Sequence, residues 1–474
     1  MDKTAAYEEA ATLFRLAAPS FVTTMCMFAL TMIEMMVAGH VGTTEMTAIA
    51  FSQIVLDFSL NFITQGFDKG LNSLASQAFG AKNHTLLGRY VQMACLIVTA
   101  LCVPLGVFWW FVGDLLPYFG VSAASVVLAR QYAHLSVLWL WPRIMFQLLV
   151  VYFQSQQIFL PTAVISLAFL VVHIVLNLVL VFGVPALHIR GMGFLGMPLA
   201  MCLTIYLRLA IYVGYMFGRK RHHARSWCWT WDFLQAKYSR KLIAVGLPLA
   251  IGRLFEDVQF QLMALMASWA GEIALDSHNC MIELYFVVTS VILGLTKAGV
   301  ARIGMYLGAG QPKQAKATSD LLLYIIAGLA AVISLGFVLG RNYVGHLFST
   351  DPRIWDTMAA VATLTGGGYL IMALFYSAMS TLLAQARGLP ILVAFFTGAW
   401  IIGIPGAYLA GIYYEMGLLG IWLGMCTGYG ATSIIALYAS CRTDWDQEAI
   451  KAVERSKHAA DELIAPDEAT TLLP

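Results

Sequence analysis

The sequence predicts an all-α membrane protein whose twelve transmembrane helices form two parallel six-helix repeats, giving two lobes around a central cavity. Three observations lead to this class: 60% of the residues are hydrophobic and only 11% are charged, long uncharged runs recur, and the second half repeats motifs of the first. A soluble domain carries about 25% charged residues, so this chain has too few to cover a solvated surface.

The spans follow from the lengths of the apolar runs, because a helix needs about 20 mostly apolar residues to cross a bilayer core. The runs are continuously apolar instead of alternating in ~10-residue segments, which favours helices over barrel strands. The first run begins near Leu13 and is too long for a signal-peptide core. We place the twelve spans at residues 13–38, 48–74, 90–112, 127–153, 160–182, 193–217, 242–270, 277–303, 320–340, 357–384, 390–411 and 417–441.

Some spans are uncharged throughout, and others contain single charges. The uncharged runs are residues 16–33, 90–113, 321–340, 357–386, 388–414 and 416–441. A further long run, from Ile144 to Leu187, holds parts of spans four and five. Polar residues before Pro161 divide it, as expected where a helix ends ahead of a proline.

The orientation follows from the basic residues, which are enriched in cytoplasmic loops. The loop at 218–241 carries seven of them: Arg219, Lys220, Arg221, Arg225, Lys237, Arg240 and Lys241. The alternate loops at 39–47, 271–276 and 412–416 carry none. Both termini are therefore predicted to be cytoplasmic. The basic loop could instead contact lipid headgroups or nucleic acid, but a net charge of +2 gives no broad basic face, so we expect no nucleic-acid partner.

An internal repeat decides the architecture. Gly80–Asn83 recurs as Gly308–Gln311, and Gly66 and Lys69 in the preceding helix recur as Gly294 and Lys297, all 228 residues later. Gln156 with Pro161 recurs as Gln385 with Pro390, and Gly193–Cys202 recurs as Gly417–Cys426. Because six spans is an even number, the second repeat enters the membrane in the same direction as the first, as in one class of secondary transporters.

The chain is accordingly divided into an N-terminal lobe at 1–217, a basic cytoplasmic linker at 218–241, a C-terminal lobe at 242–441 and a cytoplasmic tail at 442–474. The tail predicts a short amphipathic helix to about Ile464. It ends in Glu468, Leu472 and Leu473, which fit the acidic dileucine pattern that adaptor proteins read. That motif favours vacuolar or endolysosomal targeting; the alternative is the plasma membrane, with an uninvolved tail.

Six motifs are distributed over nearly the whole chain from Leu13 to Cys441: Gly39–Gly42, Ser76–Asn83, Tyr152–Gln156 followed by Pro161, Gly246–Pro248, Arg387–Gly388 and Gly420–Gly424. Together they resemble the motifs of the multidrug and toxic compound extrusion family. The resemblance implies a V-shaped pair of six-helix lobes that exchanges organic solutes for protons or sodium ions. It also implies that Glu256 is the span-seven glutamate that binds the coupling ion or substrate.

Two positions depart from the family pattern. The second span-seven glutamate of many eukaryotic members is Gln261 here, and the acidic position of span ten is Tyr376. Sodium coupling loses one of its usual ligands, so protons are the preferred coupling ion, with sodium as the alternative.

Intramembrane carboxylates are functional candidates independently of any family, because a charge at bilayer depth costs about 2.5–3.5 kcal/mol. Glu256 lies about fourteen residues into span seven, roughly 21 Å of helix rise from the cytoplasmic end. Arg253 precedes Glu256 by three residues and Asp257 by four, so it can neutralise either carboxylate. A self-contained Arg253–Asp257 pair without a transport role is the alternative.

Three further acidic residues are candidates for coupling. Glu34 lies near the outer end of span one, where the resemblance implies a carboxylate that responds to ion binding; the alternative is a side chain that reaches to the membrane interface. Asp57 in span two and Glu283 in span eight nearly correspond across the repeat, and either line the cavity or pair with neighbouring polar groups.

Polar and aromatic side chains could support solute binding, although each of them is also explained by packing. They are Gln53, Asn177, Tyr285 and Tyr376, together with Arg253, Asp257 and Gln261 from span seven. The cysteines form no CxxC pair and no His-rich spacing surrounds them, so no metal and no organic cofactor is expected.

The sequence therefore predicts a monomeric secondary transporter, not an enzyme, that exports a drug- or metabolite-like organic cation in exchange for protons. No phosphate-binding loop supports ATP-driven pumping. One rival is a lipid-linked precursor flippase of the same superfamily, which would favour a more basic cavity. The other is a membrane-embedded transferase, which would need a His/Asp or metal cluster at one interface.

Overall fold

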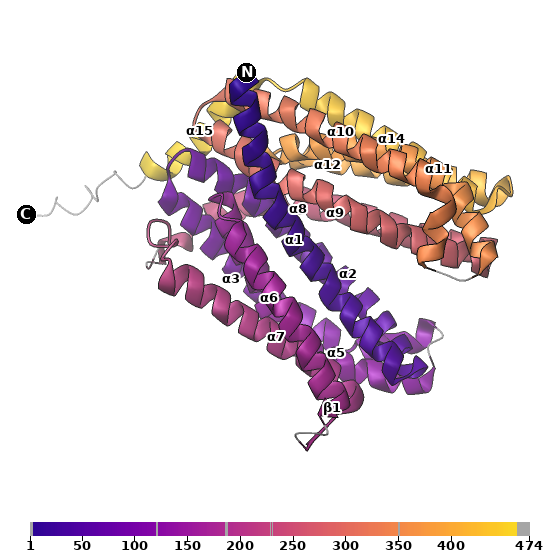
Figure 1. Ribbon diagram of the computed structural model, residues 1–474. Coiled ribbons are helices and arrows are strands. Elements are labelled where there is room, and N and C mark those ends of the chain that lie inside the picture. Colours follow the sequence, from indigo (N-terminus) through magenta and orange to yellow (C-terminus); the bar gives the residue numbers. More distant parts are fainter. Residues whose placement is uncertain are drawn as a thin grey trace, which may run out of the picture.

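The computed structural model describes residues 3–119, 122–184, 188–227, 229, 231–348 and 351–461. Within them the chain is almost entirely helical, as predicted, with one antiparallel hairpin of two-residue strands, β1 (Gly183–Val184) and β2 (Ile189–Arg190). Two groups of helices meet at the end that carries the N-terminus and α15, and they diverge toward the opposite end (Figure 1). We call these the terminal end and the far end.

The first lobe holds spans one to six. Its elements are α1 (Lys3–Val41), α2 (Thr43–Gly80), α3 (His84–Trp110), α4 (Val112–Leu115), η1 (Leu116–Phe119), α5 (Ala123–Ser155), α6 (Leu160–Asn177), η2 (Leu178–Phe182), η4 (Gly193–Leu195), α7 (Gly196–Val213) and η5 (Gly214–Arg219). The π-helical turns η2 and η5 continue α6 and α7 without a break, so each pair makes one span.

The second lobe holds spans seven to twelve. Its elements are α8 (Ala236–Ala270), α9 (Glu272–Gly308), α10 (Pro312–Val344), η7 (Gly345–Leu347), α11 (Pro352–Ala384), α12 (Gly388–Phe395), η8 (Phe396–Gly403), α13 (Ile404–Tyr408), η9 (Leu409–Tyr413) and α14 (Gly417–Cys441). The short η6 (Trp231–Phe233) lies in the linker before α8, and α15 (Trp445–Asp461) is the tail helix. Span eleven is the continuous stretch from α12 to η9.

Eleven helical stretches in the described part of the chain are long and apolar enough to cross a membrane. The remaining predicted span is α8, which has 35 residues and carries Arg253, Glu256 and Asp257 in its middle. The twelve predicted spans therefore correspond one to one with helices. Most of these helices extend past the predicted limits, because apolar composition detects only the part that crosses the bilayer.

Each lobe has its own hydrophobic core, and α1 contributes to both. The first core includes Leu30 and Ala38 of α1 and continues through α7, whereas Leu13, Leu16 and Ala17 pack into the core of the second lobe. Figure 1 shows α1 running along the boundary between the lobes. This helix therefore joins the two cores.

Small residues bring the lobes together at the terminal end, in pairs that the repeat relates. A Cβ atom on Gly80 or Gly308 would collide with the carbonyl oxygen of Met305 or Gln77, respectively. Gly308 follows Gly80 by 228 residues, and Met305 follows Gln77 by the same number. The two contacts are thus reciprocal, as expected for parallel repeats about a two-fold axis.

A second reciprocal pair lies deeper between the lobes. A Cβ on Gly66 of α2 would meet the carbonyl oxygen of Gly246 in α8 at 2.7 Å, and a Cβ on Gly294 of α9 would meet that of Ala17 in α1 at 2.9 Å. Glycine is needed at both sites because the helix backbones approach too closely for a side chain.

Polar contacts reinforce the terminal end. Glu9 of α1 pairs with Arg302 of α9, which also donates to Gln157 Oε1 at 3.2 Å. The predicted amphipathic tail helix is confirmed as α15, whose Ala449 and Ala452 are buried while Lys451 is exposed. The proposed sorting residues Glu468, Leu472 and Leu473 lie outside the described residues.

Candidate functional site

Glu256 lies at the centre of a polar cluster inside the second lobe, where only 2% of it is exposed. Its Oε2 accepts a hydrogen bond from Arg253 Nη1 at 2.7 Å. Its Oε1 accepts from the hydroxyls of Tyr429 at 2.8 Å and Tyr376 at 3.3 Å. A carboxylate is stable in such a place only when it is paired and hydrogen-bonded, and these three donors supply that requirement.

Arg253 contacts both carboxylates that the sequence places within its reach. Its Nη1 binds Glu256, and its Nη2 lies 2.8 Å from Asp257 Oδ1. The spacings of three and four residues put all three side chains on one helix face. The side chains of Arg253 and Asp257 are 21% and 16% exposed, so they cover Glu256 on the side nearer the surface.

Tyr376 and Tyr429 complete the cluster from two other helices. Tyr376 of α11, the position at which the resemblance implied an acidic residue, donates its hydroxyl to Glu256. Tyr429 of α14 was not among the residues predicted from the sequence. It lies between two glycines of an apolar span, so no charge or motif marks it, and only the packing of α14 beside α8 reveals it.

Lys69 brings the first lobe close to this cluster. It belongs to α2, which packs against α8, and it interacts electrostatically with Glu256, Asp257 and Arg253. The repeat-related Lys297 of α9 interacts in the same way with Asp68 of α2. Each lobe therefore holds one lysine within electrostatic range of a carboxylate of the other lobe.

Gln261 and Glu283 are exposed on the sides of their helices that face the first lobe. Ala250 of α8 packs on Gly66 of α2. Gln261 lies 11 residues after Ala250, so it is on the same face of α8 and closer to the far end. The hydroxyl of Ser290 in α9 lies 3.1 Å from Met25 Sδ of α1. Glu283 lies seven residues before Ser290 and therefore on the same face of α9. Both therefore face the region where the lobes diverge.

Tyr285 lies inside the second lobe, away from that region. It is buried, its hydroxyl contacts Met372 Sδ at 2.7 Å, and its ring packs against Tyr369 and Trp422. These contacts support the packing interpretation of Tyr285.

The first lobe contains a separate cluster around Glu34, which is completely buried. Its Oε2 accepts hydrogen bonds from Tyr132 at 2.7 Å and from Gln53 at 3.1 Å. Asp57 pairs with Arg143 at 3.1 Å. The interpretation of Glu34 as a side chain that reaches to the interface is wrong, because Tyr132 and Gln53 hold it inside the lobe.

A cavity of about 10 Å³ adjoins Glu34, Gln53, Asp57, Tyr132 and Arg143. That volume corresponds to roughly one water molecule. The cluster can therefore hold a proton or a water, but it has no room for an organic solute in this conformation.

Asn177 belongs to neither cluster. It is buried between α6 and α7, and its Nδ2 lies 3.0 Å from His173 Nε2, while His173 Nδ1 lies 3.0 Å from Thr204 Oγ1. The structure thus brings together Glu256, Arg253, Asp257 and Tyr376 in one lobe and Glu34, Gln53 and Asp57 in the other.

Two six-helix lobes with a buried carboxylate cluster in each define a class of protein. Ionisable groups at membrane depth mark ion or substrate pathways, and duplicated bundles that diverge at one end are typical of secondary transporters.

Comparison with known sequences identifies the family within that class. The MatE family matches residues 19–179 and again residues 248–409, once in each lobe. The chain belongs to the MatE family and is a transporter, not an enzyme. The double match also confirms the internal repeat.

The relatives and solved structures agree with this assignment. Protein DETOXIFICATION 14 of Arabidopsis thaliana is 28% identical over 457 residues, covering 93% of this chain and 90% of the relative. Human multidrug and toxin extrusion protein 1 is 24% identical, covering 90% and 74%. The crystal structure of the eukaryotic MATE transporter AtDTX14 has a TM-score of 0.86 at 24% identity, covering 95% of this chain and 99% of that one.

Proposed function

We propose that this transporter exports a small organic cation in exchange for protons by alternating access, with Glu256 as the exchanging carboxylate. The observation that carries the proposal is the cluster of two carboxylates, Glu256 and Asp257, around the single guanidinium of Arg253. Arg253 balances only one of these two negative charges. The remaining charge can be balanced by a proton, by a solute cation or by Lys69 of the other lobe.

This charge balance gives a reason for exchange. Glu256 is enclosed here, and the partly exposed Arg253 and Asp257 separate it from the region where the lobes diverge. A cation that approaches Asp257 competes with Arg253 and Lys69 for the carboxylates. A proton on Glu256 removes the charge that attracts the cation, so the proton and the solute exclude each other.

Glu34 fits the role of a second proton site. It is buried, its Oε1 has no hydrogen-bond partner among the described residues, and it adjoins a cavity of water size. Protonation of Glu34 would change its contacts with Tyr132 and Gln53, which come from α5 and α2. Proton binding in the first lobe would in this way alter helix packing there.

Substrate-dependent proton flux in proteoliposomes tests the proposal. A panel of fluorescent cations and organic acids is offered under an imposed pH gradient and then under a sodium gradient. We expect cations to drive proton flux in the wild type, and we expect Glu256→Gln to abolish this flux while the protein stays folded. Glu272→Gln, an exposed carboxylate at the start of α9, is the matched control and should transport normally.

Proton flux at the wild-type rate in the Glu256→Gln variant would show that Glu256 takes no part in the exchange. If only the sodium gradient drives flux, the coupling ion is sodium and not the proton. Movement of a lipid-linked anion instead of a cation would favour the flippase alternative, which the acidic side chains of Asp257 and Glu283 do not support.

We further propose that the terminal end is cytoplasmic, that the chain is a monomer, and that an adaptor protein reads Glu468, Leu472 and Leu473. The basic residues of loop 218–241, which returns to the terminal end (Figure 1), support this orientation.

Fluorescence microscopy of the tagged chain, with and without Leu472→Ala and Leu473→Ala, tests the sorting role. Loss of vacuolar or endolysosomal residence is the expected result.

A further inference from the structure

A pocket of about 720 Å³ lies at the terminal end, on the seam between the two lobes. The first lobe contributes Gly80–Thr85, the linker contributes Arg225, the second lobe contributes Gly308, Ala309 and Gln311, and α15 contributes Val453 and Ser456. Glu256 and Glu34 are not among its lining residues, so the pocket is distinct from both carboxylate clusters.

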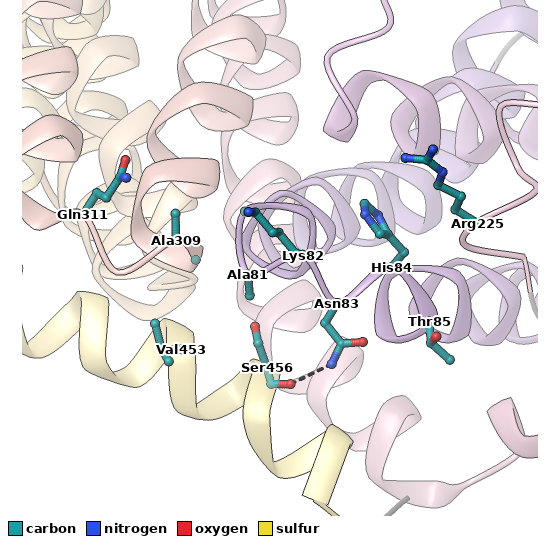
Figure 2. A pocket seen from close by; sticks show the side chains of 12 residues that line it. Ala81, Lys82, Asn83, His84, Thr85, Arg225, Ala309, Gln311, Val453 and Ser456 are labelled. Atoms are coloured by element: carbon teal, nitrogen blue, oxygen red, sulfur yellow. Dashed lines mark hydrogen bonds between the residues drawn. The ribbon is translucent and has the colours of Figure 1, made fainter.

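The charged side chains that line this pocket, Lys82 and Arg225, are both basic. His84 lies beside them, and no aspartate or glutamate is among the lining residues. Figure 2 shows these three side chains on one side of the loop between α2 and α3. On the other side, Asn83 Nδ2 donates to the backbone oxygen of Ser456 at 2.8 Å and fixes α15 against the same loop.

Buried contacts hold Arg225 in this position. The backbone of the next residue, Ser226, lies directly on Gly88 of α3, where any Cβ atom would collide with the Ser226 carbonyl. The Ser226 hydroxyl lies 2.5 Å from that of Tyr152 in α5, and Ser226 is buried. The backbone next to Arg225 is therefore fixed against the N-terminal part of α3, while the Arg225 side chain is exposed at the pocket.

Lys82 occupies a backbone position that favours glycine. Its φ is 58°, and the repeat-related residue, Gly310, has φ of 68°. Glycine adopts this left-handed conformation freely, whereas a residue with a Cβ is disfavoured there. A lysine at this point places an ammonium group at the pocket despite the less favourable backbone.

We propose that this pocket binds a multiply charged phosphate group through Lys82, Arg225 and His84. Guanidinium and ammonium donors form strong, charge-assisted hydrogen bonds to phosphate oxygens. The pocket has ample room for a diphosphate or a larger phosphorylated headgroup, and it lies on the face proposed to be cytoplasmic, where both occur. Because both lobes and α15 form its lining, the bound phosphate favours the conformation in which the terminal ends are closed.

Binding to the full-length chain in phosphatidylcholine nanodiscs tests this site. Inorganic pyrophosphate is titrated at constant ionic strength, and separate nanodiscs contain phosphatidylinositol 4,5-bisphosphate. The test variant is Lys82→Gln with Arg225→Gln. The matched control is Lys313→Gln with Lys316→Gln, which removes the same charge from exposed positions on the same face that do not line the pocket.

We expect saturable binding to the wild type and to the control, and an affinity at least about tenfold weaker in the test variant. Thermal unfolding of each variant without ligand verifies that it is folded. Tighter binding of the lipid assigns the pocket to a membrane headgroup, and equal or tighter binding of pyrophosphate assigns it to a soluble phosphate. Absence of saturable binding to both probes, or equal weakening in both double variants, would overturn the proposal.

Discussion

Arg455 of α15 donates a hydrogen bond from Nη1 to Gln77 Oε1 of α2 at 3.0 Å, and the same nitrogen lies 3.2 Å from the backbone oxygen of Gln385, which follows α11. Gln77 in turn donates to the backbone oxygen of Ala384 at 2.7 Å. Arg455 therefore joins the first lobe, the second lobe and the tail helix. A helix outside the twelve spans thus helps to keep the terminal ends together.

Substitution of Arg455→Met should loosen α15 from the terminal end. Hydrogen bonds from a charged donor contribute about 1.5–3 kcal/mol each, so the loss of two should speed amide hydrogen exchange in 445–461. Hydrogen–deuterium exchange read by mass spectrometry measures this. Lys451→Met, which removes the partly buried pair with Glu448 but no contact between the lobes, is the control, and equal exchange in both variants would contradict the role of Arg455.

Substitution of Gly308→Val should force the terminal ends apart, because the new side chain would overlap Gln77. Overpacking of a close contact costs about 1–3 kcal/mol, so the melting temperature in detergent should fall. Gly328→Ala in α10, where nothing lies near the added Cβ, should instead be neutral or stabilising by about 0.5–1 kcal/mol. If the Gly308→Val protein is as stable as the wild type, the contact between Gly308 and Gln77 does not need a residue without a side chain.

Substitution of Arg253→Met should destabilise the second lobe, since it leaves Glu256 and Asp257 without their shared partner. Removal of one member of a buried ion pair costs about 3–5 kcal/mol. Addition of Glu256→Gln and Asp257→Asn should restore most of the lost stability, because the unpaired charges are then absent. Chemical denaturation of the single and triple variants measures both effects, and a triple variant no more stable than the single one would contradict this explanation.

The two tyrosines at Glu256 should differ in their importance for transport. Tyr429 donates over 2.8 Å and Tyr376 over 3.3 Å to the same oxygen, so Tyr429 forms the stronger bond. Tyr429→Phe should slow substrate-driven proton flux by about tenfold, and Tyr376→Phe should slow it less. Initial rates in proteoliposomes compare them; a larger effect of Tyr376→Phe would reverse the assigned order.

The class of fold was predictable from the sequence, because twelve apolar runs and a repeat at 228 residues determine the number and direction of the spans. Part of the second-lobe cluster was predictable too. Arg253, Glu256 and Asp257 lie on one helix, and the helical period alone brings them together.

The remaining partners depend on helix packing that no local pattern encodes. Tyr429 reaches Glu256 across 173 residues of chain, and Tyr132 reaches Glu34 across 98. Tyr429 lies in an apolar stretch and Tyr132 lies beside Arg130 and Gln131, and at both positions an aromatic residue is equally consistent with packing. Asn177 shows the reverse case, since its polarity suggested a solute contact while the structure places it against His173.

The reciprocal contacts of Gly80 and Gly308 constrain the transport cycle. In carriers built from inverted repeats, interchange of the two repeat geometries generates the opposite gate arrangement. Here both repeats cross the membrane in the same direction. If they exchanged their conformations, the transporter would be open at the same end as before. A conformation that is open to the solute at the terminal end therefore needs contacts between the lobes at the far end, where the described helices diverge in this structure (Figure 1).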